Sequence, residues 1–368
     1  MRTSAWTAAA ALLALAAPPG VAAGNWTLRD DIYGNGFFNA FTWWDYADPT
    51  HGYVNYVSKS EARSSNLSYV ASNGAFVMRA DSSSIPQFKE SGRKSVRLHS
   101  VNTMGDGVLV AKIARMPMGC GTWPAFWTCT RRNWPSGGEI DIIEGANDQG
   151  PLNLASLHTT AGCSIAAGNT SRSSGFADKT DCISQPGCSE RFSLTNSFGK
   201  DFNQNGGGWY AMKRDTRSGG EGISVYFWPS NTSVDALPAA VAAAAGSAPP
   251  YVLTGANATA EDLAKWGQPA AHFDNGASCD MSQYFEQHEI IINLSFCGDW
   301  AGETFQSSGC GPQSCSSFVR NNPSAFEDAR WEFDYVRVYT DSAWRKAGAG
   351  LGWTAAGAVL LAGLALAL

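Results

Sequence analysis

Short segments in which apolar and polar residues alternate recur along the chain, separated by clusters of Gly, Asn, Ser and Pro. A period of two predicts half-buried β-strands, and the clusters predict the turns between them. Only the Ala-rich segment 238–245, which begins with Pro, suggests a helix. The predicted strands cover residues 75–79, 108–116, 123–129, 139–144, 152–159, 209–214, 223–228, 289–296 and 331–339.

Many short strands at irregular spacing predict an all-β fold, either a β-sandwich or a jelly roll. The sequence has no internal repeat and no Pro- or Ser-rich linker in its middle, so we expect one domain from about residue 24 to residue 340. Of its 368 residues 44% are hydrophobic and 16% are charged, which is enough apolar surface for a sizeable core.

Both ends of the chain have the pattern of targeting signals. Arg2, an apolar run and small residues at the cleavage positions predict a secretory signal peptide over residues 1–23. Compact residues at 341–343, a short spacer and an uncharged apolar tail predict a GPI-anchor signal over residues 341–368. A tail-type transmembrane helix is the alternative for this second segment. We therefore expect a secreted protein at the cell surface or in the cell wall, bound to the membrane only through a lipid anchor.

The charge and the cysteines narrow the class of protein further. A formal net charge of −6 argues against nucleic acid as a partner, because nucleic acid needs a basic footprint. Nine Cys in a secreted chain predict disulfides and leave one thiol over. Cys182 with Cys188 and Cys310 with Cys315 are candidate local pairs, although the connectivity stays open. The absence of a Cys-x-x-Cys pair argues against a zinc site.

Six Asn-x-Ser/Thr sequons also fit a secreted glycoprotein. Asn293 lies in an apolar run, so we expect it to be buried and unmodified. The sequons begin at Asn25, Asn66, Asn169, Asn231, Asn257 and Asn293.

The segment 139–144 places three acids among β-branched residues. Residues i and i+2 of a strand share a face, so Glu139 and Asp141 point the same way. Simple alternation would put Glu144 on the other face, and one extra residue, a β-bulge near Ile142 or Ile143, would restore it. Three acids on one face without a basic partner repel each other, which favours a catalytic site. A calcium site and a solvated acidic face are the alternatives.

The acidic strand and its surroundings resemble glycoside hydrolase family 16, in particular its fungal laminarinase and endo-1,3(4)-β-glucanase branch. The most specific segments are GCGTWPAFW at 119–127 and WPSGGEIDIIEG at 134–145. Further similar segments lie at residues 48–57, 92–97, 157–159, 206–212, 296–302 and 333–339.

The resemblance implies a concanavalin A-like jelly roll of two antiparallel sheets with a concave substrate cleft. It implies that Glu139 is the nucleophile, that Glu144 is the general acid/base and that Asp141 assists them. The substrate would be a β-glucan, hydrolysed with retained anomeric configuration. We expect a monomer that requires no cofactor; a structural calcium is compatible with such a fold, but no ligand set is evident.

Several other residues are candidates for binding the sugar. Fourteen Trp supply flat rings on which the apolar faces of sugar rings stack. Trp123 and Trp127 are four residues apart and share a strand face, while His158 lies one hairpin after the acids. Core packing is the alternative for the Trp residues, and an ordinary structural or surface role is the alternative for the others. The substrate-binding candidates are Trp123, Trp127, Trp134, His158, Asn55, Arg93 and Trp300.

Two further functions stay open. A GPI-anchored cell-wall transglycosylase would pass the glycosyl group to a sugar instead of water. In such relatives the acidic motif usually lacks the extra residue, whereas this chain has both Ile142 and Ile143. A non-catalytic β-glucan-binding protein is the other alternative, but relatives of that type have lost one or both of the Glu residues that this chain retains.

Overall fold

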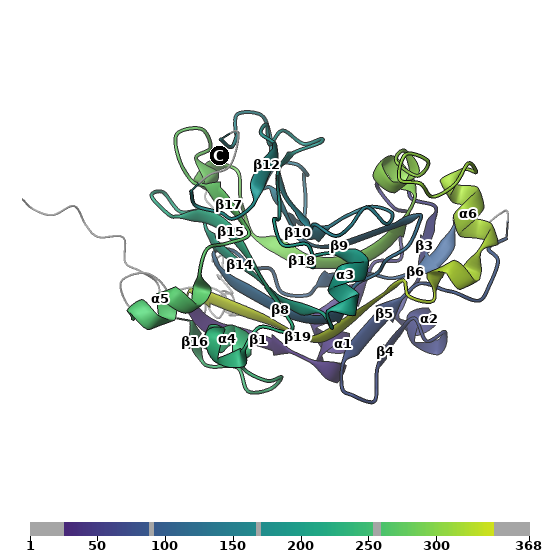
Figure 1. Cartoon of the computed structure of the whole chain (residues 1–368), viewed down its shortest axis with the longest axis horizontal. Coiled ribbons are helices and arrows are strands. Elements are labelled where there is room, and N and C mark those ends of the chain that lie inside the picture. The colour runs from purple at the N-terminus through teal and green to yellow at the C-terminus, as the bar shows by residue number, and fades with distance from the viewer. Residues whose placement is uncertain (1–25, 88–91, 167–170, 253–258, 342–368) are drawn as a thin grey trace, which may run out of the picture.

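The structure of the chain is a computed structural model, and it describes residues 26–87, 92–166, 171–252 and 259–341. Two large antiparallel sheets pack face to face (Figure 1). The first has nine strands in the order β16 (Tyr251–Val252), β1 (Trp26–Ile32), β19 (Arg330–Asp341), β8 (Gly107–Arg115), β14 (Gly208–Asp215), β15 (Gly222–Pro229) and β17 (Ala271–Asp274), with β5 (Phe76–Arg79) and β4 (Ser68–Val70) added beside β19.

The second sheet carries the acidic strand. Its eight strands run in the order β12 (Phe176–Lys179), β13 (Cys188–Arg191), β11 (Leu154–His158), β10 (Glu139–Glu144), β9 (Thr122–Thr130), β18 (His288–Phe296), β7 (Arg97–Ser100) and β2 (Phe41–Trp43). A separate parallel pair joins β3 (Val54–Tyr56) to β6 (Arg93–Ser95). This arrangement confirms the predicted jelly-roll sandwich.

Short helices occupy the connections. They are α1 (Phe37–Ala40), α2 (Lys59–Ser64), α3 (Gly199–Gln204), α4 (Ala239–Ala242), α5 (Ala260–Trp266) and α6 (Cys315–Asn321). The helix predicted at 238–245 is therefore shorter than expected. Two helices that the hydrophobic pattern missed begin at capping residues: Ser58 accepts from the backbone N–H of Glu61, and Thr259 and Asp262 form a capping box.

The core lies between the two sheets, where alternate side chains of each strand point inward. Phe126 of β9 and Phe333 of β19 meet across it with ring centroids 5.8 Å apart. Ile140, Ile142 and Ile143 of β10 are all fully buried. The other face of the second sheet is consequently free to carry polar side chains.

All nine predicted strands are confirmed, with ends that differ by at most two residues. The strands that the sequence pattern missed are mostly short, such as β2, β3 and β6 with three residues each. Three residues contain too few alternations for a period of two to be recognised.

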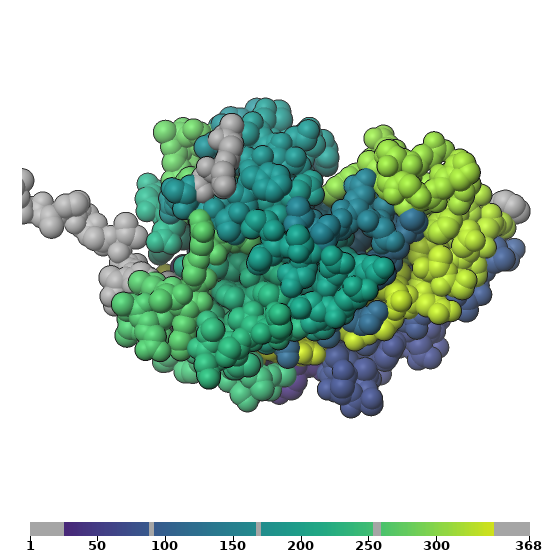
Figure 2. Space-filling view, viewed as in Figure 1, coloured from purple at the N-terminus to yellow at the C-terminus, as the bar shows by residue number. Residues whose placement is uncertain are grey.

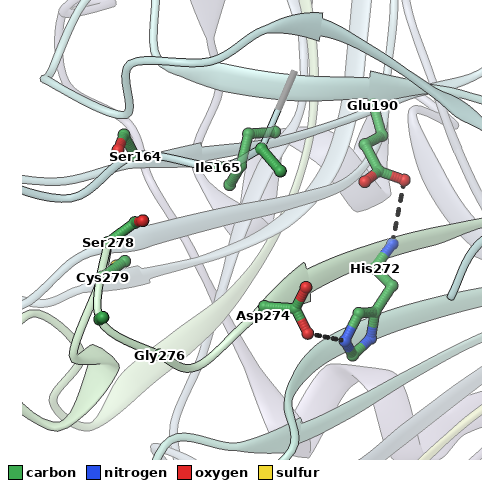
Figure 3. A pocket seen from close by; sticks show the side chains of 10 residues that line it. Ser164, Ile165, Glu190, His272, Asp274, Gly276, Ser278 and Cys279 are labelled. Atoms are coloured by element: carbon green, nitrogen blue, oxygen red, sulfur yellow. Dashed lines mark hydrogen bonds and ion pairs between the residues drawn. The ribbon is translucent and has the colours of Figure 1, made fainter. Parts of the chain in front are cut away.

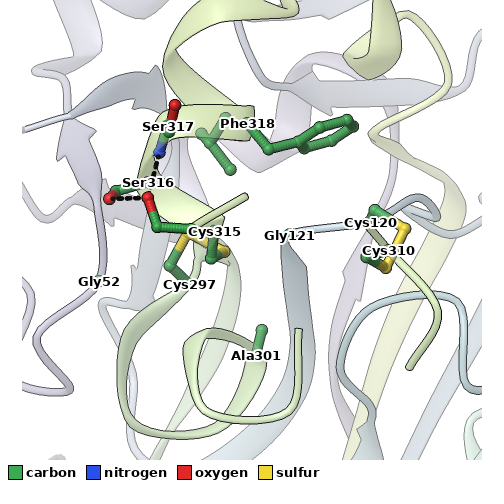
Figure 4. The surroundings of a disulfide bond; sticks show 12 residues. Gly52, Cys120, Gly121, Cys297, Ala301, Cys310, Cys315, Ser316, Ser317 and Phe318 are labelled. Carbon is green, nitrogen blue, oxygen red and sulfur yellow. Dashed lines mark hydrogen bonds between the residues drawn. A yellow bond between two sulfur atoms is a disulfide. The ribbon is translucent and has the colours of Figure 1, made fainter. Parts of the chain in front are cut away.

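Four disulfides join the loops: Cys120–Cys310, Cys163–Cys279, Cys182–Cys188 and Cys297–Cys315. The candidate pair of Cys182 with Cys188 is confirmed, and that of Cys310 with Cys315 is wrong. Cys315 begins α6 and meets Cys297 at the end of β18, while Cys310 meets Cys120 just before β9 (Figure 4). Cys129 is the remaining thiol and is buried.

A small pocket lies where β13 and β17 of the two sheets face each other (Figure 3). The backbone N–H of His272 donates to Glu190 Oε2 at 3.1 Å, and His272 Nε2 lies 3.1 Å from Asp274 Oδ1. Glu190 also accepts from the Ser173 hydroxyl. Because these bonds join polar groups of both sheets, the pocket links the two layers at their edge.

The described residues include no helix that is both long and apolar enough to cross a membrane. The expected signal peptide, nearly all of the expected anchor signal and the sequons at Asn25, Asn169 and Asn257 lie outside the described residues.

Candidate active site

The three acids lie on the outer face of the second sheet because β10 contains a bulge. On β9, Asp141 pairs with Trp127 and Glu144 pairs with Ala125. Three steps along β10 therefore match two steps along β9, and the pairing of β10 with β11 shifts in the same interval. The predicted bulge is confirmed, and it returns Glu144 to the face of Glu139 and Asp141.

Asn153 holds the bulge in place, a role that the sequence analysis missed. Its side-chain oxygen accepts from the backbone N–H of Glu144 at 3.2 Å, and its side-chain NH₂ donates to the carbonyl of Ile142 at 2.8 Å. Asn153 is fully buried. A bulge leaves ladder groups unpaired, so this one side chain satisfies a donor and an acceptor that the neighbouring strand does not reach.

Glu139 lies between a Trp and a His. Trp134 Nε1 donates to Glu139 Oε2 at 2.5 Å, and His158 Nε2 lies 3.8 Å from Oε1. Burial and the nearby charge of Asp141 raise the pKa of Glu139, while His158, Trp134 and Arg97 oppose this rise.

Asp141 and His158 form a buried ion pair. His158 Nε2 lies 3.0 Å from Asp141 Oδ2, and His158 Nδ1 donates to the carbonyl of Ser184. Burial lowers the pKa of His158, but the contacts with Asp141 and the charge of Glu139 outweigh it and raise the pKa to about 10. The imidazole is therefore a cation at neutral pH and compensates the carboxylates around it.

Glu144 has a different donor. Trp123 Nε1 donates to Glu144 Oε1 at 2.8 Å. Burial and Asp141 raise the pKa of Glu144, and the Trp123 bond opposes this only in part. The two Glu residues thus share Asp141 as a neighbour, but the imidazolium lies beside Glu139. Such an asymmetry favours an ionised Glu139 beside a protonated Glu144.

One group of side chains in this site has the geometry to hold a metal ion. Ligand atoms of Glu139, Asp141 and His158 all lie within 4.8 Å of one another. A cation there would compete with the proton of His158 for the same carboxylates. No other such group of three occurs among the residues that the structure describes.

The predicted Trp residues lie around these acids. Trp127 is the cross-strand partner of Asp141, and its Nε1 donates to Asn293 Oδ1 at 2.7 Å. The Trp300 ring meets the Trp123 ring edge-on with centroids 5.9 Å apart. Trp134 exposes 42% of its surface. Asn293 is buried, as expected from its apolar run.

Two candidates lie elsewhere. Arg93 does not line a cleft, because it is fully buried and donates to the carbonyls of Val319 and Asp81 at 2.9 Å. It ties β6 to α6 and to the loop that joins β5 to β6. Asn55 lies in β3, outside the eight-stranded sheet, and no described contact joins it to the acids.

The outer face of the sheet also carries polar side chains that the sequence analysis did not select. Arg97 of β7 donates from Nε to His99 Nε2 at 2.9 Å, and His99 Nδ1 lies 2.5 Å from Glu289 Oε2. Arg131 donates to the other oxygen of Glu289. Their positions in sequence are unremarkable, and only the strand pairing places them in one row with the acids.

The surface above these strands is hollowed. In Figure 2 a notch separates the lobe that contains β12 from the lobe that contains α6. The cysteine bridges of Figure 4 lie in the second lobe, where Asn147 donates to the carbonyl of Ala301 at 3.1 Å and so fixes the turn that carries Trp300.

Comparison with known proteins identifies the family of the chain. The model of the XgeA-like catalytic domain of glycoside hydrolase family 16 matches residues 41–339. A probable endo-1,3(4)-β-glucanase of Aspergillus fumigatus is 38% identical over 329 residues, which are 85% of this chain and 45% of that protein. An endo-1,3(4)-β-glucanase of Arthroderma benhamiae is 36% identical over 338 residues, which are 89% of this chain and 68% of that protein.

Two solved structures are also similar. Laminarinase 16A of Phanerochaete chrysosporium, solved with β-glucans in its donor and acceptor sites, has a TM-score of 0.75 and 39% identity, covering 86% of this chain and 99% of that one. An elongating family 16 β-1,3-glucosyltransferase has a TM-score of 0.72 and 32% identity, covering 86% and 100%. This chain thus spans less than half the length of the Aspergillus relative but nearly all of these two domains. The chain belongs to glycoside hydrolase family 16, with the XgeA-like catalytic domains.

Proposed function

We propose that this protein is a retaining endo-β-glucanase that hydrolyses β-1,3-glucans, mixed β-1,3/1,4-glucans or both. The observation that carries the proposal is the bulged strand β10, which presents Glu139, Asp141 and Glu144 on one face with a separate Trp donor on each Glu. Two carboxyl groups in different electrostatic surroundings are what a double displacement requires. The β-glucanase relatives support the choice of substrate.

In the first displacement, a carboxylate oxygen of Glu139 attacks the anomeric carbon. The glycosidic C–O bond breaks, its electron pair stays on the leaving oxygen, and that oxygen takes the proton of Glu144. The raised pKa of Glu144 keeps this proton available at neutral pH. His158 stabilises the charge of the attacking carboxylate before the bond forms.

In the second displacement, water replaces the leaving sugar. Glu144, now a carboxylate, takes a proton from the water as its oxygen attacks the anomeric carbon, and the ester to Glu139 breaks. Two inversions restore the original β configuration. The electron pair of the broken ester bond stays on Glu139, which leaves as a carboxylate, and the imidazolium of His158, held by Asp141, stabilises that charge for the next turnover.

The direct test is product analysis of the purified protein on laminarin and on a barley-type mixed-linkage glucan, with Glu139→Gln as control. Short oligosaccharides that initially carry the β anomer, and that the variant does not release, are the expected result. Inverted products, or binding of glucan without any turnover, would refute the proposal. The ratio of rates on the two polymers identifies the preferred linkage.

Transglycosylation is a second candidate function, and the similarity to an elongating β-1,3-glucosyltransferase favours considering it. It would share the first displacement and differ only in the acceptor. Product analysis on a single purified β-1,3-gluco-oligosaccharide separates the two, because transfer yields oligosaccharides longer than the starting one. The bulge residue Ile142 favours the hydrolase.

We further propose that the protein is secreted and held at the cell surface by a GPI anchor. Four disulfides support an oxidising compartment. Treatment of intact cells with phosphatidylinositol-specific phospholipase should release the protein, and protein found only in the medium before treatment would contradict the anchor.

A further inference from the structure

A row of rings and charges leads from the acidic strand to the far edge of its sheet. Trp127 of β9 is opposite Asp141. The guanidinium of Arg97 lies 5.2 Å from the ring centroid of Trp127 and 5.2 Å from that of Trp44. Since Trp44 follows β2, the edge strand, this row crosses the sheet from β10 to its margin.

Trp44 and Tyr46 complete the row at the margin. The backbone N–H of Trp44 donates to the carbonyl of Arg97, which continues the pairing of β2 with β7 and puts Trp44 on the face of Arg97. The Trp44 ring stacks on His99, with centroids 4.9 Å apart and planes 15° apart. Tyr46 meets Trp44 edge-on at 5.1 Å and is 70% exposed, the largest value among the exposed apolar side chains of the described residues.

The segment that carries Tyr46 is anchored close to that side chain. Asp48 Oδ2 accepts from the backbone N–H of Gly52 at 3.1 Å, from the Thr50 hydroxyl at 3.0 Å and from the Ser295 hydroxyl at 2.7 Å. The side chain of Asp48 is 2% exposed and lies 3.8 Å from Arg97. Tyr46 is thus an exposed ring on a fixed support, which is the form of a binding platform with little ordering entropy to lose.

The distance to the acids sets what such a platform can bind. Strand β2 is four strands from β10 in the sheet order, which at the usual strand spacing is roughly 19 Å. Only a substrate several sugar units long can reach from the bond that is cleaved to Tyr46. A disaccharide or trisaccharide would leave the platform empty.

We propose that Tyr46 and Trp44 form an outer sugar-binding subsite at the β2 edge of the cleft, which makes the enzyme favour long β-glucan chains over short ones. The proposal rests on the proposed function for the identity of the substrate. Its physical basis is the stacking of an apolar sugar face on an exposed aromatic ring. Tyr46 supplies that exposed ring, which neither Trp44 alone nor the charged side chains around Arg97 would provide.

The test measures kcat/KM on a series of β-1,3-gluco-oligosaccharides, from the trisaccharide to the decasaccharide, for the wild type and for Tyr46→Ala. The expected loss is roughly three- to tenfold on the longest substrates, the size of one aromatic contact, and none on the shortest. Tyr46→Phe should retain the wild-type profile, because it keeps the ring. Tyr251→Ala is the matched control, since Tyr251 is 57% exposed on β16 of the opposite sheet.

Equal chain-length profiles for the wild type and Tyr46→Ala would overturn the proposal, and so would an equal loss on all lengths. If the wild type cleaves none of the oligosaccharides, the proposed function fails, and retardation in laminarin-containing gels then decides the subsite separately. Weaker retardation of Tyr46→Ala than of Tyr251→Ala supports it, and equal retardation refutes it.

Discussion

Glu139 of β10 and His158 of β11 are direct cross-strand partners, and His158 Nε2 lies 3.8 Å from Glu139 Oε1 while it contacts Asp141 at 3.0 Å. One buried imidazolium therefore faces two of the three acids. It stabilises the ionised form of Glu139, which Asp141 alone would destabilise.

Replacing His158 should consequently shift the acid side of the pH profile. In His158→Gln the cation is lost, the pKa of Glu139 rises further, and the acid limb of kcat/KM moves to higher pH by about one unit. The pH dependence of kcat/KM on laminarin measures this. His272→Gln is the matched control, because His272 is also buried beside a carboxylate but lies in β17 of the other sheet. An acid limb equal to that of the control would contradict the role of His158.

The alkaline limb of the pH profile of kcat/KM should depend on Trp123. Its hydrogen bond stabilises the charged form of Glu144, so Trp123→Phe raises the pKa of Glu144 further. The alkaline limb of kcat/KM should then move to higher pH by about one unit, the value of one hydrogen bond to a charged group. Trp300→Phe changes the ring packed against Trp123 but removes no donor to Glu144, and it should leave the limb in place. A shift of the acid limb instead would mean that Trp123 affects the pKa of Glu139 and not that of Glu144.

The roles of the two Glu residues should be distinguishable from how the rate of each Ala variant depends on the leaving group of the substrate. Glu144→Ala should lower kcat/KM on laminarin about 10²–10⁴-fold, because general acid catalysis is lost. The rate of the first displacement should stay close to that of the wild type on an aryl glucoside whose leaving group departs as a phenolate and needs no proton. Glu139→Ala should lose both reactions.

Added azide provides the control for this assignment. With Glu144→Ala, azide should intercept the glycosyl-enzyme and yield the β-glycosyl azide. With Glu139→Ala, it should attack directly and yield the α-glycosyl azide from an activated β-fluoride. Exchanged products would mean that the two roles are reversed.

Asn153 should affect both stability and catalysis. Asn153→Ala leaves the N–H of Glu144 and the carbonyl of Ile142 without their side-chain partner, which should lower the free energy of unfolding by about 1–3 kcal/mol. It should also lower kcat, because the bulge aims Glu144. Asn203→Ala removes an equivalent pair of bonds to the backbone of Met116, which join α3 to the residue after β8 and involve none of the three acids. Both variants should unfold at lower denaturant concentration, and only Asn153→Ala should lose kcat; equal kcat values would remove Asn153 from the positioning of Glu144.

Much of the fold and of the acid trio could be predicted because the signal is local. Alternation along a strand repeats every two residues. Glu144 lies five residues after Glu139, so alternation alone would put the two side chains on opposite faces, and this was enough to predict the bulge. Arg93 shows where local reasoning fails. Its segment resembles the family as strongly as its neighbours do, but its guanidinium makes five hydrogen bonds to the four carbonyls at positions 81, 84, 319 and 320, which no pattern near residue 93 indicates.

The sequence by itself determined which residues alternate, where the acids stand along their strand and that an odd number of cysteines leaves at least one unpaired. Only the tertiary structure decided which strands are neighbours. That choice sets the register in which His158 is directly opposite Glu139, brings Cys310 to Cys120 across 190 residues, and aligns Trp127, Arg97 and Trp44 into one row. The physical reason is that strand periodicity arises within each strand, whereas register arises from burying all the apolar faces of both sheets at once.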